Sequence, residues 1–303
     1  LITGGFGYLG GRLAQFLVSQ ENYEIFLGSR QQTQPPPWLS QAKVVETRWG
    51  SLQGLQEICS GVDAIVHLAG MNAQDCAAES AAALEANAVA TTRLLQAAIR
   101  QKVERFIYVS TAHVYGSPLE GAITEKTNPT PVHPYAVSHR AKEDAVSQSR
   151  EIEGIVIRLS NAYGAPADKD VNCWMLLVND LCRQAAISGK LVLHSPGLQK
   201  RDFIPLHDVV RAIQHFIELP VDKFGSAFFN LGGEAPYRII DLAELIAGRC
   251  EVVLGFRPEI ERPDSVLGES YPELNYKIDK LKETGFILNG NIENEIDATL
   301  KFC

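Results

Sequence analysis

The chain lacks three features that would each narrow its function at once. It has no apolar run as long as a membrane span, so nothing in the sequence indicates an integral membrane protein. Its six cysteines form no Cys-x-x-Cys pair and no cluster with histidine at metal-ligand spacing, which argues against a zinc site or a disulfide framework. Positive charge is also scarce: 28 lysines and arginines face 36 acidic residues, and the net charge of −8 disfavours a nucleic-acid surface.

These absences leave a water-soluble protein. The scattered cysteines predict reduced thiols in a cytoplasmic protein that binds neither membrane nor nucleic acid. A local basic pocket for a phosphorylated ligand stays compatible with the acidic chain. The sequence opens inside a strand pattern without methionine, so we expect a few residues to precede Leu1.

Three glycines at three-residue spacing follow the first apolar residues, in the stretch Thr3-Gly4-Gly5-Phe6-Gly7-Tyr8-Leu9-Gly10. Gly4 permits a tight turn, Gly7 lets backbone approach a phosphate, and Gly10 allows a helix to pack closely on a strand. The helix that follows points its N–H groups and its positive dipole end at the anion. A Walker-type phosphate loop would need Gly-Lys-Ser/Thr, whereas this chain has Gly10-Gly11-Arg12. The stretch therefore predicts a site for a dinucleotide pyrophosphate.

Short apolar strands alternate with helical patterns through the first half of the 303 residues. Such alternation predicts an α/β fold with a doubly wound parallel sheet of the Rossmann type, in which the carboxyl ends of the strands form the ligand side. The predicted strands are 25–27, 44–46, 64–68, 105–110 and 154–159, and the predicted helices are 11–19, 54–60, 78–101 and 135–152.

The pattern loosens after Tyr163. A helix at 173–188 and a short strand at 191–194 follow a polar loop, whereas 203–216 and 227–231 again read as strand and helix of the main sheet. We therefore predict two domains, with a binding cleft between them. Residues 1–163 and 204–232 form the dinucleotide-binding domain, and residues 164–203 and 233–303 form a smaller, discontinuous α/β substrate domain.

Several segments, taken in order, resemble the extended short-chain dehydrogenase/reductase family, the nucleotide-sugar epimerases and reductases. They are the glycine stretch, His67-Leu68-Ala69-Gly70, Asn87, Ser110-Thr111-Ala112-His113-Val114-Tyr115-Gly116, Pro134-Tyr135, Arg158-Leu159-Ser160-Asn161-Ala162-Tyr163-Gly164 and Arg201-Asp202-Phe203-Ile204. The likeness covers nearly the whole chain, and the order of so many segments makes it specific.

Thr111 and Tyr135 form the predicted catalytic pair. Thr111 follows an apolar strand at the ligand edge, and a phenol beside a hydroxyl can exchange a proton with a sugar oxygen while hydride moves at the neighbouring carbon. The resemblance implies that Tyr135 is the general acid/base and that Thr111 hydrogen-bonds the reacting oxygen.

Four residues after Tyr135 the family has lysine, and this chain has His139. A neutral imidazole can hydrogen-bond the nicotinamide ribose but supplies less positive charge, unless His139 is a partly exposed histidine in a decayed site. Lys142 shares the helical face but lies two turns from Tyr135.

The end of the second strand indicates which cofactor is preferred. Where an acidic residue would accept from the adenosine ribose, the chain has Gly28-Ser29-Arg30. Ser29 and Arg30 can donate to a 2′-phosphate, so we expect NADP(H) rather than NAD(H), although an ordinary loop arginine stays an alternative. Ser51 stands where the family usually has aspartate, before Leu52, which predicts an altered adenine pocket.

The resemblance implies further contacts with the cofactor and the sugar nucleotide. It assigns cofactor contacts to Gly4, Gly7, Tyr8, Leu9, Gly10, Ser29, Arg30, Ser51, Leu52, Leu68, Ala69, Gly70, Ser110, Tyr135 and His139. It assigns substrate contacts to Thr111, Ala112, His113, Tyr135, Asn161, Arg201 and Arg262. Simple turn packing is the alternative for Ala69 and Gly70, and a surface salt bridge for Arg262. Asn87 is predicted to be structural, and no metal site is predicted.

The resemblance leaves two reactions open. The dehydratase branch carries an Asp-Glu pair where this chain has Ala112-His113, so we predict an NAD(P)-dependent epimerase or ketoreductase acting on a nucleotide-activated sugar. The alternative is a catalytically weakened NADP(H)-binding sensor or scaffold protein, motivated by His139 and Ser51. Helices 78–101 and 135–152 match those through which family members pair, which predicts a homodimer.

Overall fold

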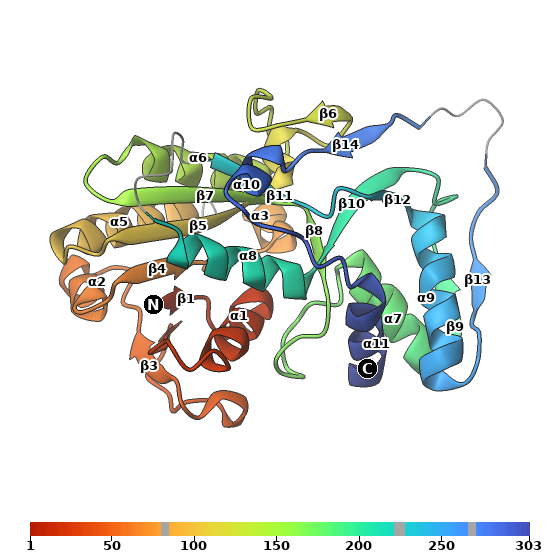
Figure 1. Ribbon diagram of the computed structural model, residues 1–303, viewed down its shortest axis with the longest axis horizontal. Coiled ribbons are helices and arrows are strands. Elements are labelled where there is room, and N and C mark those ends of the chain that lie inside the picture. The colour runs from red at the N-terminus through yellow and green to blue at the C-terminus, as the bar shows by residue number, and fades with distance from the viewer. Residues whose placement is uncertain (80–84, 221–227, 266–270) are drawn as a thin grey trace.

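The computed structural model describes residues 1–79, 85–220, 228–265 and 271–303 (Figure 1). The strands are β1 (Ile2–Thr3), β2 (Phe26–Ser29), β3 (Lys43–Glu46), β4 (Ala64–His67), β5 (Arg105–Thr111), β6 (Gly121–Ile123), β7 (Glu153–Leu159), β8 (Asn161–Tyr163), β9 (Lys190–Val192), β10 (Lys200–Pro205), β11 (Phe228–Leu231), β12 (Pro236–Arg238), β13 (Glu259–Glu261) and β14 (Leu274–Tyr276). The helices are α1 (Tyr8–Val18), α2 (Leu52–Cys59), α3 (Ala73–Ala78), α5 (Ala90–Arg100), α6 (Pro134–Gln148), α7 (Leu177–Ser188), α8 (Leu206–Glu218), α9 (Ile239–Leu254), α10 (Asp279–Glu283) and α11 (Ile292–Phe302). Shorter turns are the 3-10 helices η1 (Pro37–Leu39) and η3 (Ala112–Tyr115) and the π-helical η2 (Glu85–Val89).

A seven-stranded sheet in the order β11-β7-β5-β4-β1-β2-β3 forms the centre of the molecule. Every neighbouring pair in it is parallel, with β1 between β2 and β4. This arrangement confirms the predicted doubly wound α/β fold. The order reverses at β1, so the carboxyl ends of β1 and β4 flank a switch point where ligands bind in such sheets.

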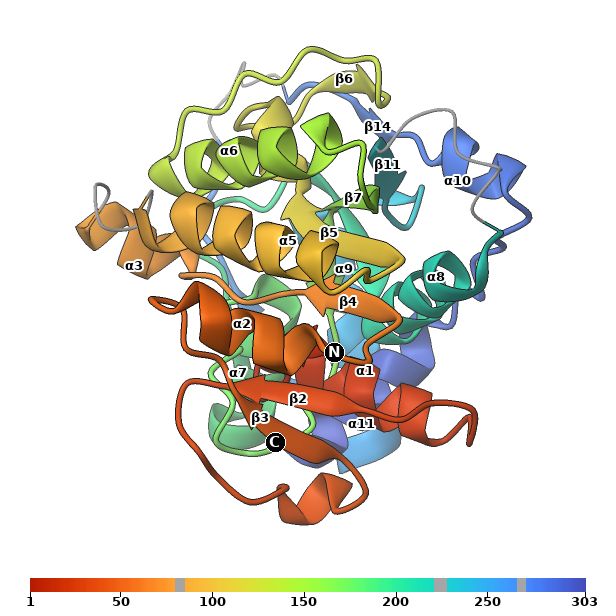
Figure 2. The ribbon, with the colours of Figure 1, turned by 90° about the vertical axis from the view of Figure 1, so that its left-hand side faces the viewer.

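Helices cover both faces of this sheet because its strands are apolar on both sides. Along β5, Ile107 and Val109 join the core beneath α1 and α8, whereas Phe106 and Tyr108 join the core beneath α2, α5 and α6. Figure 2 shows α2, α5 and α6 on the side nearer the viewer than β4 and β5. The sheet is thus the middle of three layers. Because helices cover its two faces, a ligand can approach it at the ends of its strands.

A second core lies beside the sheet, where α7, α9 and α11 pack together near β9 and β13 (Figure 1). The prediction for 203–216 is partly wrong here. Its helix, α8, does cover the main sheet, but β10 pairs with β8 and β12 in a separate three-stranded sheet. Phe228–Leu231 does extend the main sheet as β11, and residue 227 lies outside the described residues.

Two predicted helices have different bounds in the structure. The segment 78–101 is interrupted: α3 ends at Ala78, residues 80–84 lie outside the described residues, and a π-helical turn precedes α5. The first helix begins at Tyr8, a turn before the predicted start near Gly11, because glycines at its start let it pack against the preceding turn.

A buried ion pair fixes α6 on the sheet. The Arg158 guanidinium on β7 donates from Nη2 and Nε to Glu143 on α6, at 2.7 and 3.0 Å, and Ser110 Oγ on β5 donates to the same carboxylate at 2.7 Å. Glu143 is fully buried, so losing one partner would leave a costly unpaired charge. The pair therefore sets the position of the helix that carries Tyr135.

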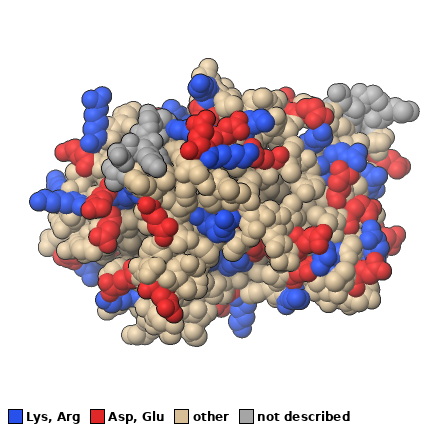
Figure 3. Space-filling model, in the orientation of Figure 1, with Lys and Arg blue, Asp and Glu red and all other residues tan. Residues whose placement is uncertain are grey.

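The surface carries mixed charge (Figure 3), and the cysteines are unpaired. On the face in Figure 3, basic and acidic side chains are interspersed. All six cysteines are free thiols, and Cys303 is the exposed one. Within the described ranges, no group of three or more potential metal-ligating side chains occurs. No helix in the part of the chain that the structure describes is long and apolar enough to span a bilayer.

Candidate functional site

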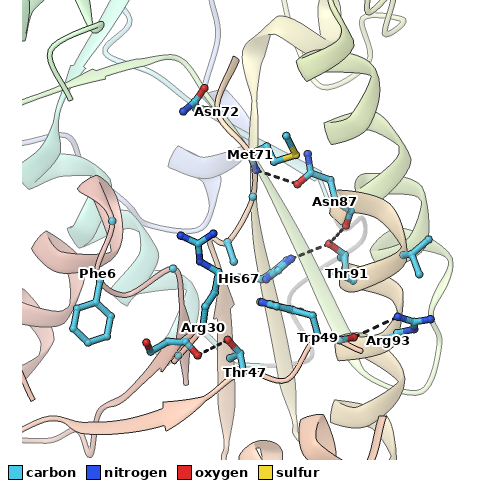
Figure 4. A pocket seen from close by; sticks show the side chains of 18 of the residues that line it. Phe6, Arg30, Thr47, Trp49, His67, Met71, Asn72, Asn87, Thr91 and Arg93 are labelled. Atoms are coloured by element: carbon cyan, nitrogen blue, oxygen red, sulfur yellow. Dashed lines mark hydrogen bonds between the residues drawn. The ribbon is translucent and has the colours of Figure 1, made fainter. Parts of the chain in front are cut away.

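A crevice of about 1260 Å³ opens at the carboxyl ends of β1, β2, β3 and β4. Its walls come from five segments: the turn after β1, the end of β2, and the loops after β3 and β4, together with the η2–α5 junction (Figure 4). It therefore lies where the sequence predicts the dinucleotide.

The glycine turn after β1 is built without room for side chains. Gly4 has a φ of +72°, and a Cβ there would come within 3.0 Å of the Ala69 backbone. A Cβ on Gly10 would lie 2.2 Å from the carbonyl oxygen of Gly4. No side chain caps the N-terminus of α1, and its first turn holds no acidic residue, so its N–H groups stay available to an anion. This cradle fits the pyrophosphate of a dinucleotide.

Tyr8 and Leu9 reach this site only through their backbone. The Tyr8 hydroxyl donates to the carbonyl of Gly164 at 2.9 Å and to Oδ1 of Asn179 at 3.3 Å. The Leu9 side chain packs against the main core. What these residues offer a phosphate is therefore the N–H groups of the first helical turn.

Two arginines flank the end of the crevice formed by β2 and β3. Arg30 follows Ser29, and Arg93 on α5 lines the same space and donates to the backbone carbonyl of Trp49 at 3.4 Å (Figure 4). Neither arginine forms an ion pair within the described ranges. Trp49 and Arg93 were not predicted as site residues, because only the tertiary structure brings the β3 loop and α5 to this end.

Ser51 and Leu52 are not part of the crevice wall. The Ser51 hydroxyl accepts from the backbone N–H of Gly54 at 3.0 Å and thereby caps α2, and Leu52 packs against the core under that helix. Trp49 and Gly50, just before them, line the crevice instead. The Ser51 side chain is thus engaged by the helix that it begins, and the cofactor contacts of Ser51 and Leu52 stay predictions.

The turn after β4 forms the opposite wall. Ala69 and Gly70 line the crevice as predicted, whereas the Leu68 side chain packs against the core. His67 also lines it, with one ring nitrogen 2.7 Å from Thr3 Oγ1 and the other 2.8 Å from Thr91 Oγ1. Burial, then the charge of Lys142, holds the pKa of His67 well below its usual value, so this ring is neutral.

The predicted catalytic pair lies beside the crevice. Thr111 ends β5, and Tyr135 opens α6. Burial raises the pKa of Tyr135 to about 12; the charge of Cys76 adds to this, and a hydrogen bond with the Thr111 side chain opposes it. Thr111 and Tyr135 are therefore neighbours, and the phenol keeps its proton at neutral pH.

A chain of hydrogen bonds joins this pair to the crevice wall. Asn87 accepts from the backbone N–H of Met71 at 3.1 Å and donates to Ser138 Oγ at 3.1 Å. Ser138 Oγ in turn donates to the backbone carbonyl of Tyr135 at 2.9 Å. Asn87 is thus structural, as expected, and it ties the β4 turn to α6.

Two predicted site residues around this pair, His139 and Ser110, are placed differently from each other. His139 is only 8% exposed, so it is no partly exposed surface histidine. Its ring lies 4.3 Å from that of Tyr135, between ring centres, and its Nδ1 lies 2.6 Å from the hydroxyl of Tyr108. Burial, followed by the charge of Lys142, holds the pKa of His139 well below its usual value. The Ser110 side chain donates to Glu143, and its predicted contact with the cofactor stays a prediction.

Lys142 enters the site unexpectedly. Its side chain is 1% exposed, and its Nζ donates to the carbonyl of Ala69 at 3.3 Å. Burial lowers the pKa of Lys142 to about 8. Its spacing from Tyr135 signalled a shared helical face, but not that the long side chain reaches the β4 turn.

The predicted substrate residues fall into two groups. Ala112 and His113 begin η3 directly after Thr111, and desolvation followed by the charge of Arg201 lowers the pKa of His113. Asn161 and Arg262 make other contacts. Asn161 donates to the carbonyl of Asp202 at 2.8 Å, and Arg262, which is exposed, donates to the carbonyl of Pro196 at 2.6 Å. Arg262 is therefore held against the loop between β9 and β10.

Comparison with known proteins agrees with this geometry. The model of the NAD dependent epimerase/dehydratase family matches residues 1–232. The chain is 25% identical over 292 residues to the "Uncharacterized UDP-glucose epimerase YtcB" of Bacillus subtilis (strain 168), covering 89% of this chain and 86% of that protein. It is 28% identical over 269 residues to the dTDP-D-glucose 4,6-dehydratase of Homo sapiens, covering 80% and 71%.

Among solved structures, the fold is similar to that of the UDP-N-acetylglucosamine 4-epimerase of Methanobrevibacter ruminantium M1, solved in complex with UDP-N-acetylmuramic acid. The TM-score is 0.82 at 20% identity, covering 99% of this chain and 96% of that one. At this identity the likeness is one of fold.

Proposed function

Because the chain belongs to the NAD dependent epimerase/dehydratase family, we propose that it is an NADP(H)-preferring epimerase or ketoreductase that acts on a nucleotide-activated sugar. The observation that carries the proposal is that the phosphate cradle and Tyr135 belong to one connected site. A phosphate cradle opens on one side of the crevice, and hydrogen bonds through Asn87 and Ser138 link its far wall to Tyr135.

A nicotinamide supplies or accepts the hydride when it is bound beside Tyr135. In the oxidative half of an epimerisation, it is the phenolate form of Tyr135, which the raised pKa makes scarce at neutral pH, that accepts the hydroxyl proton of the sugar as the hydrogen on the same carbon leaves as hydride. In the reductive half, the phenol returns that proton to the carbonyl oxygen as hydride adds to the carbon. Thr111, which neighbours Tyr135, orients the reacting oxygen.

The same residues disfavour a dehydration. Elimination of water needs an acid and a base beside the reacting carbons, and the positions after Thr111 hold the buried methyl of Ala112 and the imidazole of His113. We therefore propose proton and hydride exchange at one carbon.

We propose that the sugar nucleotide lies at the carboxyl end of β5, against the part of the molecule that contains the second core of α7, α9 and α11. His113 and Arg201 are close enough for the arginine charge to act on the imidazole, and a guanidinium there can bind phosphate oxygens. Residues 164–203 and 233–303 would form the substrate domain in this proposal, and residues 1–163 and 204–232 the cofactor domain.

The experiment that tests the proposed function separates binding from turnover. We expect wild-type protein to quench or shift NADPH fluorescence and to oxidise NADPH with at least one member of a panel of keto-sugar nucleotides. The alternative, a sensor or scaffold protein, is favoured by the neutral His139. It predicts NADPH binding without turnover, and a gain of turnover in His139→Lys. Absence of binding to both NADPH and NADH would contradict the proposal.

The preference for NADP(H) gives a testable selectivity. A guanidinium bonded to a 2′-phosphate contributes about 1.5–3 kcal/mol, so Arg30→Ala should weaken NADPH binding by roughly 10- to 150-fold. The affinity for NADH should stay within about twofold. Fluorescence titration of both cofactors measures this. Arg93→Ala should act in the same direction because Arg93 lines the same end.

The matched control is Arg48→Ala. Arg48 pairs with Glu46 outside the crevice lining, so its loss should change neither affinity. Equal losses of NADPH and NADH affinity in Arg30→Ala would reject the preference for NADP(H).

We also propose a homodimer through α5 and α6. Val137 on α6 is 41% exposed, which leaves an apolar side chain on the surface of this helix. Multi-angle light scattering should give twice the 33.2 kDa of one chain. A mass of one chain at micromolar concentration would reject the dimer.

A further inference from the structure

The ammonium group of Lys142 is buried without an acidic partner. Its contacts are the hydrogen bond to the Ala69 carbonyl and the face of the Tyr108 ring, whose centre lies 5.5 Å from Nζ. No carboxylate in the described part of the chain forms an ion pair with it. An ammonium has three donors, so most of its hydrogen-bonding capacity is unused. Such burial is costly and indicates a role other than stability.

The neighbouring carboxylate does not neutralise this charge. Glu143, the next residue on α6, is turned toward Arg158 and Arg140, at 2.7 and 3.1 Å, and toward Ser110. The ionisable groups around Lys142 are instead His67 on β4, Tyr108 on β5, Cys76 on α3 and His139 on its own helix. The charge of Lys142 adds to burial in keeping both imidazoles neutral.

The ammonium also lies directly beneath the crevice wall. A Cβ on Gly70 would come within 2.8 Å of Nζ and 3.3 Å of Asn87 Oδ1. Ala69, Gly70 and Asn87 all line the crevice. Glycine at position 70 therefore leaves the ammonium in contact with the crevice wall that the turn after β4 forms.

We infer that Lys142 is a positioning residue for the nicotinamide half of the dinucleotide. Lys142 lies two helical turns after Tyr135 on α6, and its ammonium supplies the positive charge that the neutral His139 lacks. Its hydrogen bond to Ala69 holds the Ala69–Gly70 turn against that half of the ligand. His139, kept neutral, is then free to act as a hydrogen-bonding group beside Tyr135. This inference rests on the proposed function, since it assumes that a dinucleotide occupies the crevice.

The test is the variant Lys142→Met, which removes the charge and keeps an unbranched side chain. NADPH affinity should fall about tenfold, a loss typical of one charge-assisted contact. Affinity for 2′,5′-ADP, which has the adenosine half and no nicotinamide, should stay unchanged. The melting temperature should stay the same or rise, because an unpaired buried charge is removed. Lys126→Met, at an exposed lysine, gives the same change of net charge and should alter none of these values.

A spectroscopic readout separates this role from a merely structural one. In wild-type protein labelled at histidine, the NMR titration of His139 should lie well below that of a free imidazole, and Lys142→Met should move it upward. A tenfold loss for NADPH with this upward movement supports the inference. Equal losses for NADPH and 2′,5′-ADP, or an unchanged NADPH affinity, would overturn it.

The wild-type protein offers a second measurement that does not depend on a variant folding. The pKa of Lys142 is about 8, so its charge is present below that pH and is lost above it. NADPH affinity should therefore fall as pH rises through about 8, while 2′,5′-ADP affinity stays level. Parallel pH profiles for the two ligands would overturn the inference alone. Wild-type protein that binds neither ligand would overturn the proposed function together with it.

Discussion

Replacing Tyr135 by phenylalanine is expected to lower kcat by about 1000-fold, within the range typical of a general acid/base. The phenol has a pKa raised to about 12 by burial, so it is protonated at neutral pH and donates that proton to the carbonyl oxygen of the sugar. Phenylalanine keeps the ring that packs on His139 and removes only the proton donor. NADPH affinity should therefore stay unchanged, and the measurement is the single-turnover rate of NADPH oxidation with a keto-sugar nucleotide.

The matched control is Tyr163→Phe. The hydroxyl of Tyr163 is buried and has no hydrogen-bond partner among the residues that the structure describes, so its removal should leave both folding and turnover intact. Because the Tyr135 phenol keeps its proton through neutrality, its own titration should not change the reductive rate across that range. A Tyr135→Phe variant that keeps a tenth or more of the wild-type rate would remove the tyrosine from the chemistry.

Gly10→Ala is expected to have the second largest effect, on cofactor affinity. Its Cβ would lie 2.2 Å from the Gly4 carbonyl and 2.8 Å from the Cα of Gly5, which forces the helix away from the turn. Both contacts are with backbone, so no flexible side chain can yield. Overpacking of this kind costs about 1–3 kcal/mol, which corresponds to roughly 5- to 150-fold weaker NADPH binding if the distortion falls on the cradle.

Gly248→Ala is the control for this variant. Gly248 lies in α9, outside the crevice lining, and a Cβ there would meet Nη1 of Arg257 at an ordinary contact distance of 3.5 Å. Calorimetric titration with NADPH should show wild-type affinity for Gly248→Ala and a large loss for Gly10→Ala. Equal affinities for the two variants would mean that the glycine turn does not hold the pyrophosphate.

The sheet was predictable from sequence because its strands are short apolar runs separated by helical periods. β5 and β7 have nearly the predicted bounds, since both are buried on both faces. β10 misled the prediction for the same reason: Phe203 and Ile204 are as apolar as a central strand. Its partners are β8 and β12, and no local pattern tells which sheet an apolar strand joins.

The candidate site was predictable where one local pattern carries the chemistry. The glycine turn and the Thr111–Tyr135 pair follow from spacing and from their positions at strand and helix ends. In the structure the turn lines the crevice and Thr111 neighbours Tyr135, whereas their roles stay predictions. Contributions that depend on the reach of a side chain were not predictable. Lys142 reaches the β4 turn, and Arg93 reaches the β3 loop, from helices whose periodicity gives only a face.

Ser51 shows that a position in a motif does not determine where its side chain points. Its position matches a family residue that contacts the cofactor, but its hydroxyl caps α2, a role that serine commonly takes at a helix start. The capping bond turns the side chain away, and the crevice wall is formed by Trp49 and Gly50 instead. The motif position therefore identified the loop but not which of its residues line the crevice.

The most direct test of the account is a crystal structure of the protein with NADP⁺ and a sugar nucleotide. The account predicts the pyrophosphate on the turn that begins at Gly4, the 2′-phosphate beside Arg30, and the nicotinamide next to Tyr135. A nicotinamide ring held away from Tyr135, or a dinucleotide bound outside this crevice, would contradict it.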